Sequence, residues 1–231
     1  MTNQLVMKKL LLIATLFQWS TYSNGQISIG LKTGPSLTKL AFVTDGTYGS
    51  TSIKYSPGIG YFFGGEVAFT LSEKFALAAE IQHTSLTSII KFSEQDLPYS
   101  YKEEDLLKLQ YLQLPVTLRY TLGTGKLSPY FLFGPTIGYL TSLTVNAEYE
   151  ETDGVSTYSE TYNYSVSGKD WKQYSRVALN ATAGFGINKE LGPGFLNVEL
   201  RYNYNFTDLQ RAPGSITYRT TNLGIGYKLS F

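Results

Sequence analysis

The chain has 231 residues and a formal net charge of +1, and charged residues make up only 16% of it. It has no Cys and a single His, which excludes disulfides, thiol catalysis and Cys-based zinc sites. The balanced charge argues against nucleic-acid binding, and an aromatic content of 15%, with 19 Tyr, argues against disorder. What remains is the composition of an all-β protein.

The first 25 residues have the layout of a secretory signal peptide. Lys8 and Lys9 supply a positive region, a short apolar run follows at 10–17, and small residues precede a cleavage site after Gly25. The apolar run is too short for a transmembrane helix, which needs about 20 residues. We therefore predict a signal peptide at 1–25 and one domain at 26–231.

Eight later segments alternate between apolar side chains and small or polar ones, the period of two that a β-strand requires. In chain order they are 27–31, 59–71, 75–81, 112–122, 131–139, 177–187, 196–206 and 223–231. The first is short, and the fifth is the weakest because apolar residues fall on both faces and Pro135 interrupts it.

The connections between these segments alternate strictly between long and short. The long ones cover about 33–58, 91–105, 142–173 and 207–218, and the short ones contain turn residues. Outer-membrane barrels have short turns on the periplasmic side and long loops on the extracellular side. The pattern thus predicts an eight-stranded antiparallel up-and-down transmembrane β-barrel, with both chain ends in the periplasm and the long loops outside the cell.

A soluble barrel or sandwich would also alternate, but with its apolar face turned inward and many charges outside. Here the apolar face is wide, aromatic at its ends and nearly uncharged, which favours contact with outer-membrane lipid. The other face carries Gly, Thr, Asn and a few charges, which suits the narrow interior of an eight-stranded barrel.

Several motifs resemble those of the PorT-like outer-membrane β-barrel family of Bacteroidetes, within the wider class of small OmpA- and OmpX-like barrels. They are the opening GLKTGPSLT at 30–38, YLQLP at 111–115, the Pro-Tyr, Gly-Pro and Gly-Tyr pairs between 129 and 139, and the aromatic-terminated last strand at 224–231. The opening departs from the family at Ser36 and Thr38, where Asn and Ser are usual. The resemblance implies the barrel but no activity, because the family is functionally mixed; its eponymous member is tied to type IX secretion and gliding.

Charged residues gather on the inward face. By parity counted along separate strands, the set comprises Lys32, Glu66, Glu80, Arg119, Glu199, Arg201 and Lys228. Unpaired burial of a charge costs several kcal/mol, so we predict one ion-paired network near mid-barrel. The network would form a plug that fixes strand register; the alternative is a selective pore or proton path.

His83 is the only candidate general base of its type, and it shares the outward face of its strand with Ser85. Placed at the extracellular end of the third strand, the pair would suit a lipid-modifying enzyme. No acid is spaced to orient the His on this strand, so an interfacial polar residue is the simpler interpretation.

The third long loop combines acidic residues with aromatic ones: Tyr149, Tyr158, Tyr162, Tyr164 and Trp171. It is either a recognition surface or a solvated hairpin that extends strands five and six. Its acids do not match the spacing of a calcium loop, and we predict no metal or cofactor. The sequence favours a non-enzymatic outer-membrane protein that binds a protein partner or serves a surface or secretion machine, with a small porin-like channel as the alternative.

Overall fold

The computed structural model describes residues 27–42, 47–48, 51–96, 98–123, 125–210 and 216–231; the predicted signal peptide lies outside them. The strands are β1 (Ile27–Phe42), β2 (Thr47–Tyr48), β3 (Thr51–Thr70), β4 (Phe75–Asp96), β5 (Tyr99–Thr121), β6 (Leu127–Thr152), β7 (Thr157–Ser165), β8 (Val177–Leu191), β9 (Gly194–Asn205) and β10 (Ile216–Ser230), with a 3-10 helix η1 (Gly168–Gln173). No helix among these residues is long and apolar enough to cross a membrane.

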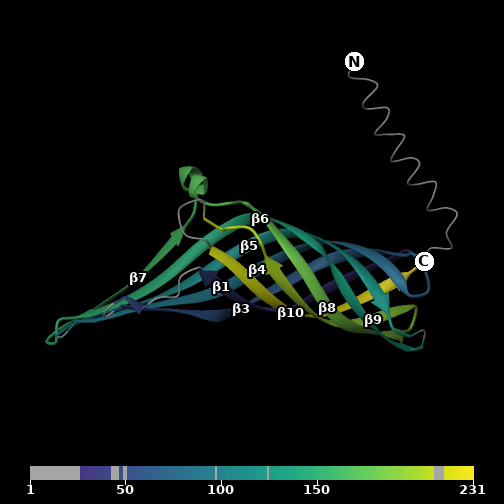
Figure 1. Ribbon diagram of the computed structural model, residues 1–231, viewed down its shortest axis with the longest axis horizontal. Helices are drawn as coiled ribbons and strands as arrows, with labels where there is room; N and C mark the ends of the chain where they lie inside the picture. Colours follow the sequence, from purple (N-terminus) through teal and green to yellow (C-terminus); the bar gives the residue numbers. More distant parts are fainter. Residues whose placement is uncertain (1–26, 43–46, 49–50, 97, 124, 211–215) are drawn as a thin grey trace, which may run out of the picture.

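Eight of the strands close into a ring. The antiparallel order β1-β10-β9-β8-β6-β5-β4-β3 returns to β1, which pairs with both β10 and β3. The closing seam runs from Ser28 opposite Ser230 to Phe42 opposite Ile216. The predicted eight-stranded antiparallel barrel is therefore confirmed, and Figure 1 shows its tilted strands with the C-terminus at the end away from β7.

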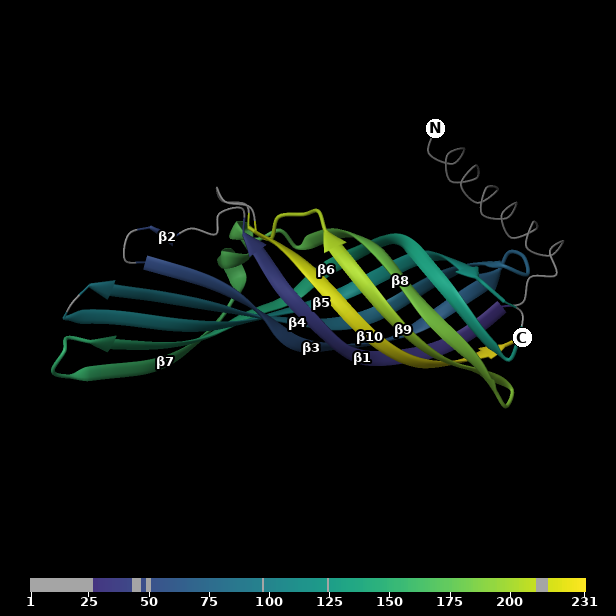
Figure 2. The same ribbon diagram turned by 60° about the horizontal axis from the view of Figure 1, so that its bottom comes forward.

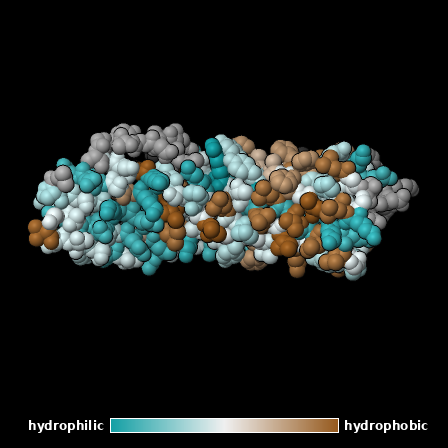
Figure 3. Space-filling view, turned by 90° about the horizontal axis from the view of Figure 1, so that it is seen from below, coloured by the Kyte–Doolittle hydropathy of each residue, from teal (hydrophilic) through white to brown (hydrophobic). Residues whose placement is uncertain are grey.

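Strand alternation sorts side chains between the inside and the outside of the ring. Leu31, Ile59 and Phe133 expose 74%, 75% and 65% of their surface, whereas the inward Thr38, Thr117 and Glu199 expose at most 1%. Figure 3 shows apolar side chains gathered over the barrel half and polar ones over the other half. An exposed apolar belt around a polar interior is the arrangement of a membrane barrel.

Three of the ring strands continue far past it. β4, β5 and β6 contain 22, 23 and 26 residues, about twice the 9–11 that a bilayer requires. With the start of β3 and with β7 they form an open sheet of residues 51–57, 88–96, 99–107, 143–152 and 157–165, here called the extension. Figure 2 shows it projecting from one end of the barrel, the hairpin end; the short turns lie at the opposite turn end.

The predicted loop boundaries are wrong at the hairpin end. β1 reaches Phe42 rather than ending near residue 31, and most of the predicted loop at 91–105 is strand, since β4 ends at Asp96 and β5 begins at Tyr99. On β1 the outward positions Thr33, Pro35 and Lys39 are not apolar, and on the extension both faces carry polar residues, so the apolar alternation stops in both places. Backbone pairing needs no such contrast and continues.

The hairpin end of the barrel is closed by an apolar cap. Inward residues of six ring strands and residues from the loops that follow β7 and β9 pack together: Leu40, Leu86, Leu109, Tyr111, Leu140, Leu143, Val166, Ala178, Leu209, Ile216 and Tyr218. Backbone hydrogen bonds hold Leu209 in place between the segment that precedes β8 and the start of β10. They run from Ser175 N to Leu209 O at 2.8 Å and from Leu209 N to Ile216 O at 2.8 Å. The apolar core therefore lies across the mouth of the barrel.

Candidate functional site

The barrel interior holds an ion-paired cluster, here called the lumen network, of Lys32, Glu66, Glu80, Arg119, Glu199 and Arg201. All six are buried, with no more than 5% of any side chain exposed. Three bases and three acids make the cluster neutral, which burial of charge requires.

Lys32 lies at the centre of the network. Its Nζ is 2.6 Å from Glu66 Oε2, 3.2 Å from Glu80 Oε1 and 3.0 Å from Glu199 Oε1. Glu66 and Glu80 are directly opposite each other on β3 and β4, a pairing that repels like charges. An ammonium group that reaches both carboxylates offsets this repulsion.

The two arginines bind these carboxylates in bidentate fashion. Arg119 donates to both Glu66 oxygens at 2.5 Å, and Arg201 donates to both Glu80 oxygens at 2.9 and 2.6 Å. Arg201 Nε is also 2.6 Å from Glu199 Oε1. Such fork-like pairs fix geometry as well as charge, so strands from opposite sides of the ring are joined through the lumen.

Two further residues lie at the lumen: Lys228, which the sequence placed in the ion-paired network but which lies outside it, and Tyr130, which sequence reasoning missed. Lys228 is half-buried and makes no ion pair among the described residues; its Nζ lies 5.8 Å from the centre of the Phe195 ring. Tyr130 donates to Glu199 at 2.8 Å and accepts from Asn197 at 2.8 Å. Parity counted back from Gly134 along β6 would have placed Tyr130 inward.

Inward glycines make room for these long side chains. A Cβ on Gly186 would come within 2.6 Å of the Tyr130 ring, and one on Gly224 would press on Phe62 at 3.1 Å and Glu199 at 3.3 Å. The inward Gly residues of the alternating pattern therefore leave the space that the side chains of the lumen occupy.

The extension carries a second cluster on the face that continues the lumen, here called its inner face. Tyr149 lies 6.1 Å from Tyr101, 6.0 Å from Tyr158 and 6.4 Å from Tyr162, measured between ring centroids. Phe92 packs edge-on against Tyr101 at 5.8 Å. The rings therefore form one continuous aromatic surface across four strands.

Carboxylates lie between these rings and accept hydrogen bonds from them. Glu103 accepts from Tyr101 at 2.9 Å and Tyr162 at 3.0 Å, and Glu160 accepts from Tyr149 at 2.7 Å and Tyr158 at 2.9 Å. The two phenol donors lower the pKa of Glu160, while partial desolvation and Glu103 raise the pKa of Asp105. Neutral donors fix these carboxylates in place and leave their charge unbalanced.

The opposite, outer face of the extension has a different character. It carries lysines beside glutamates, with Lys91 Nζ 2.6 Å from Glu104 Oε2 and Lys102 Nζ 3.8 Å from Glu150 Oε1. These residues border a shallow depression of about 570 Å³. The outer face therefore balances its own charge.

The structure separates the five aromatic residues predicted as a recognition loop. Tyr149, Tyr158, Tyr162 and Tyr164 lie on the β6–β7 hairpin, and Tyr164 donates to Asp170 of η1 at 2.9 Å. Trp171 lies in η1, packs against the apolar cap and stacks with Arg176 at 4.7 Å. Trp171 thus belongs to the closure of the barrel and the tyrosines to the extension.

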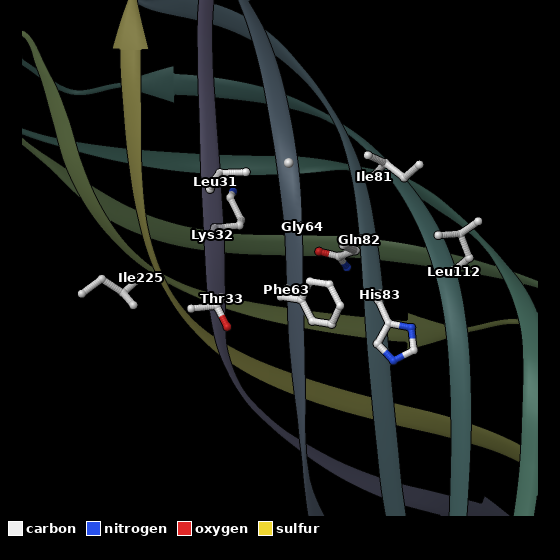
Figure 4. Close-up of a pocket in the computed structure, with 11 residues that line it drawn as sticks. Leu31, Lys32, Thr33, Phe63, Gly64, Ile81, Gln82, His83, Leu112 and Ile225 are labelled. Carbon is white, nitrogen blue, oxygen red and sulfur yellow. The ribbon is translucent and has the colours of Figure 1, made fainter.

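His83 faces outward from the middle of β4, which continues 13 residues beyond it, so its predicted place at a strand end is wrong. Its ring lies 5.2 Å from Phe63 and 6.2 Å from Tyr61, and it makes no hydrogen bond within the described chain. Figure 4 shows it beside Phe63 and Leu112 at a wall depression of about 550 Å³. Ser85, the other member of the predicted pair, is buried. Cα atoms two residues apart on a strand are separated by about 7 Å, and no hydrogen bond joins Ser85 to His83 in the described chain.

The sequence of residues 18–211 matches the family described as outer membrane protein beta-barrel domain. This chain belongs to that family. The belt of outward apolar residues is accordingly its membrane surface, and its location is the outer membrane. No curated protein matches the sequence.

The solved structures that this chain resembles include several outer-membrane proteins. Neisserial surface protein A is 11% identical, with 90% of this chain and 100% of that chain covered and a TM-score of 0.44. OprG from Pseudomonas aeruginosa is 12% identical, with 87% and 95% covered and a TM-score of 0.44. Ail, the attachment invasion locus protein of Yersinia pestis, is 13% identical, with 87% and 98% covered and a TM-score of 0.40. At these identities the likeness concerns the fold alone.

Proposed function

We propose that this barrel is a non-enzymatic binding protein, anchored in the outer membrane by the ring and engaging a protein partner through the extension. The observation that carries the proposal is the contrast between a closed interior and an open projection. Inside, the charges of the lumen network are paired and the mouth is capped. On the extension, Tyr158 and Tyr162 expose 57% and 44% of their surface.

The proposal includes the orientation of the molecule. The turn end and both termini face the periplasm, and the extension projects outside the cell, as short turns and long hairpins do in this class of barrel. The motifs at 30–38 and 111–115 support membership of the PorT-like group, and a role beside a surface or secretion machine would be consistent with it. Outer-membrane lipid and one protein partner would then be its contacts.

A channel needs a continuous water path through the barrel, and two layers of side chains block such a path here. The lumen network spans the interior at mid-barrel, and the apolar cap covers the hairpin end. We therefore expect no steady conductance in planar bilayers. Ion-selective conductance that changes on neutralising Arg119 or Glu199 would favour the channel instead.

Removal of the β6–β7 hairpin tip tests the proposal. Residues 146–163 are replaced by Asn-Gly, which joins Val145 to Tyr164, two residues that face each other across the hairpin. This cut spares Val166 and Trp171, which belong to the apolar cap. The shortened barrel should still show heat-modifiable gel mobility but should lose envelope proteins that the full chain retains after extraction in mild detergent. Identical retained proteins for both forms would contradict the proposal.

A further inference from the structure

β7 is an open sheet edge. It pairs with β6 over nine residues without a register shift, and it pairs with no other strand of the described chain. Every one of its residues is exposed. Proteins usually protect an edge with charged residues, above all Lys, or with Pro, a bulge or a very short strand, and of these the sequence TYSETYNYS has only the charge of Glu160.

The hydrogen bonds at the two ends of the hairpin show which backbone groups of β7 are free. Val166 N donates to Leu143 O at 3.0 Å, and Asp153 N donates to Ser156 O at 3.3 Å. Hydrogen-bonded pairs alternate along antiparallel strands, so the even-numbered residues of β7 bond to β6. The residues that turn N–H and C=O toward the open edge are Thr157, Ser159, Thr161, Asn163 and Ser165.

Every charged residue on the inner face beside this edge is acidic. By strand alternation this face carries Glu94, Asp96, Glu103, Asp105, Glu151 and Glu160. No Lys or Arg lies on the inner face of the extension as defined above. Glu103 and Glu160 are held by tyrosine hydroxyls, and the exposed faces of those tyrosine rings attract cations.

We propose that β7 accepts an extended, basic segment of a partner protein as an added strand, with Lys or Arg at alternate positions lying on the inner face against Glu160, Tyr158 and Tyr162. Strand addition takes affinity from main-chain hydrogen bonds and specificity from alternate side chains. The inference rests on the proposed binding function and adds the chemistry of the partner. A second copy of this chain fits less well, because a two-fold pairing of β7 edges would place two acidic inner faces side by side.

The test uses the full-length protein in detergent and a labelled synthetic peptide of nine residues, Thr-Lys-Val-Lys-Thr-Lys-Val-Lys-Thr, followed by fluorescence anisotropy. Thr161→Pro removes an N–H at the open edge and none that bonds to β6, so peptide affinity should fall about tenfold or more. Thr161→Val keeps that N–H and should bind within about twofold of the unaltered protein. Ser159→Pro repeats the first change at a second edge position.

A second set of variants distinguishes binding at the inner face from non-specific attraction between the basic peptide and the acidic protein. Glu160→Gln on the inner face should weaken binding several-fold at low salt, whereas Glu148→Gln on the outer face should leave it unchanged. A peptide with Glu in place of Lys, and one N-methylated at alternate residues, should both fail to bind. The inference would be overturned if the unaltered protein and both proline variants bound the peptide equally well. It would also be overturned if the protein formed concentration-dependent dimers that blocked the peptide.

Failure of this inference is distinguishable from failure of the proposed function. If the peptide does not bind but the shortened hairpin still loses an envelope partner, the binding function stands and the basic-strand chemistry is wrong. If shortening loses nothing, the binding function itself fails.

Discussion

The lumen and the inner face of the extension are one continuous face of the sheet. The charges are paired in the first region and are left without an opposite charge in the second. On β5, Arg119 lies in the lumen, and Glu103 and Asp105 lie on the same side of the strand in the extension. In the lumen network three carboxylates are matched by three bases, and the half-buried Lys228 lies outside that network. On the extension six carboxylates lie among tyrosines, with no base on that face of the described strands.

Solvent accounts for the difference. A charge in the closed lumen must find a partner within the protein, because the cost of an unpaired buried charge is several kcal/mol. A charge on the extension is hydrated and can remain unpaired at little cost. The first region therefore stabilises the barrel, and the second retains unbalanced charge that a binding partner can neutralise.

The largest effect should come from breaking the balance in the lumen. Arg201→Ala leaves Glu80 without its bidentate partner and should lower the free energy of unfolding by about 3–5 kcal/mol. The double change Arg201→Ala with Glu80→Ala restores neutrality and should cost less than Arg201→Ala alone. Equilibrium unfolding in detergent of both single variants and the double variant measures this. Simple addition of the two single effects would show that the residues do not act as one network.

Truncation within the apolar cap should have the next largest effect. Leu109 and Leu112 are both on β5, and they expose 1% and 43% of their surface, so they form a matched pair of a buried and an exposed leucine. Leu109→Ala should cost about 2–4 kcal/mol of unfolding free energy through lost burial and the cavity left behind. Leu112→Ala, on the membrane surface, should cost clearly less in the same assay. Equal costs would mean that the cap does not stabilise the hairpin end.

The exposed pair on the outer face should contribute little. Lys91 and Glu104 each expose 49% of their side chains although their charged atoms are 2.6 Å apart. A double-mutant cycle with Lys91→Ala and Glu104→Ala should give a coupling of at most about 1 kcal/mol, falling with added salt. A coupling as large as that of the lumen pair, or one insensitive to salt, would remove the contrast between the regions.

The smallest effect concerns titration of the aromatic surface. Desolvation and the Glu103 carboxylate raise the pKa of Tyr101 from 10.0 to about 12. Its stabilising contribution is fully present below pH 10 and is lost as the pH rises toward about 12, because the unfolded chain releases that proton first. Ultraviolet difference titration of the protein and of Tyr101→Phe should give curves that differ by one phenolate, which titrates above pH 10. Coincident titration curves would contradict the assignment.

Parity in the sequence was sufficient to place the charged lumen residues, because a one-residue slip would move all of them into lipid. It also located the apolar belt of the ring strands. It could not find the apolar cap, whose members Val166, Leu209 and Leu40 come from segments with no shared period. It set the strand ends too early at the hairpin end because the extension has polar residues on both faces, and it could not show that Trp171 joins the cap rather than the tyrosines.

The seam between β1 and β10 has a kinetic consequence. Ser28 lies opposite Ser230, so the contact that closes the ring joins residues separated by almost the whole sequence. Until β10 arrives, β1 and β9 each present a long unpaired edge, the state most prone to wrong pairing between chains. Contacts of such high sequence separation form slowly. Insertion into the membrane is therefore expected to be limited by docking of the last strand, and chaperoning of the unsealed chain must last until that step is complete.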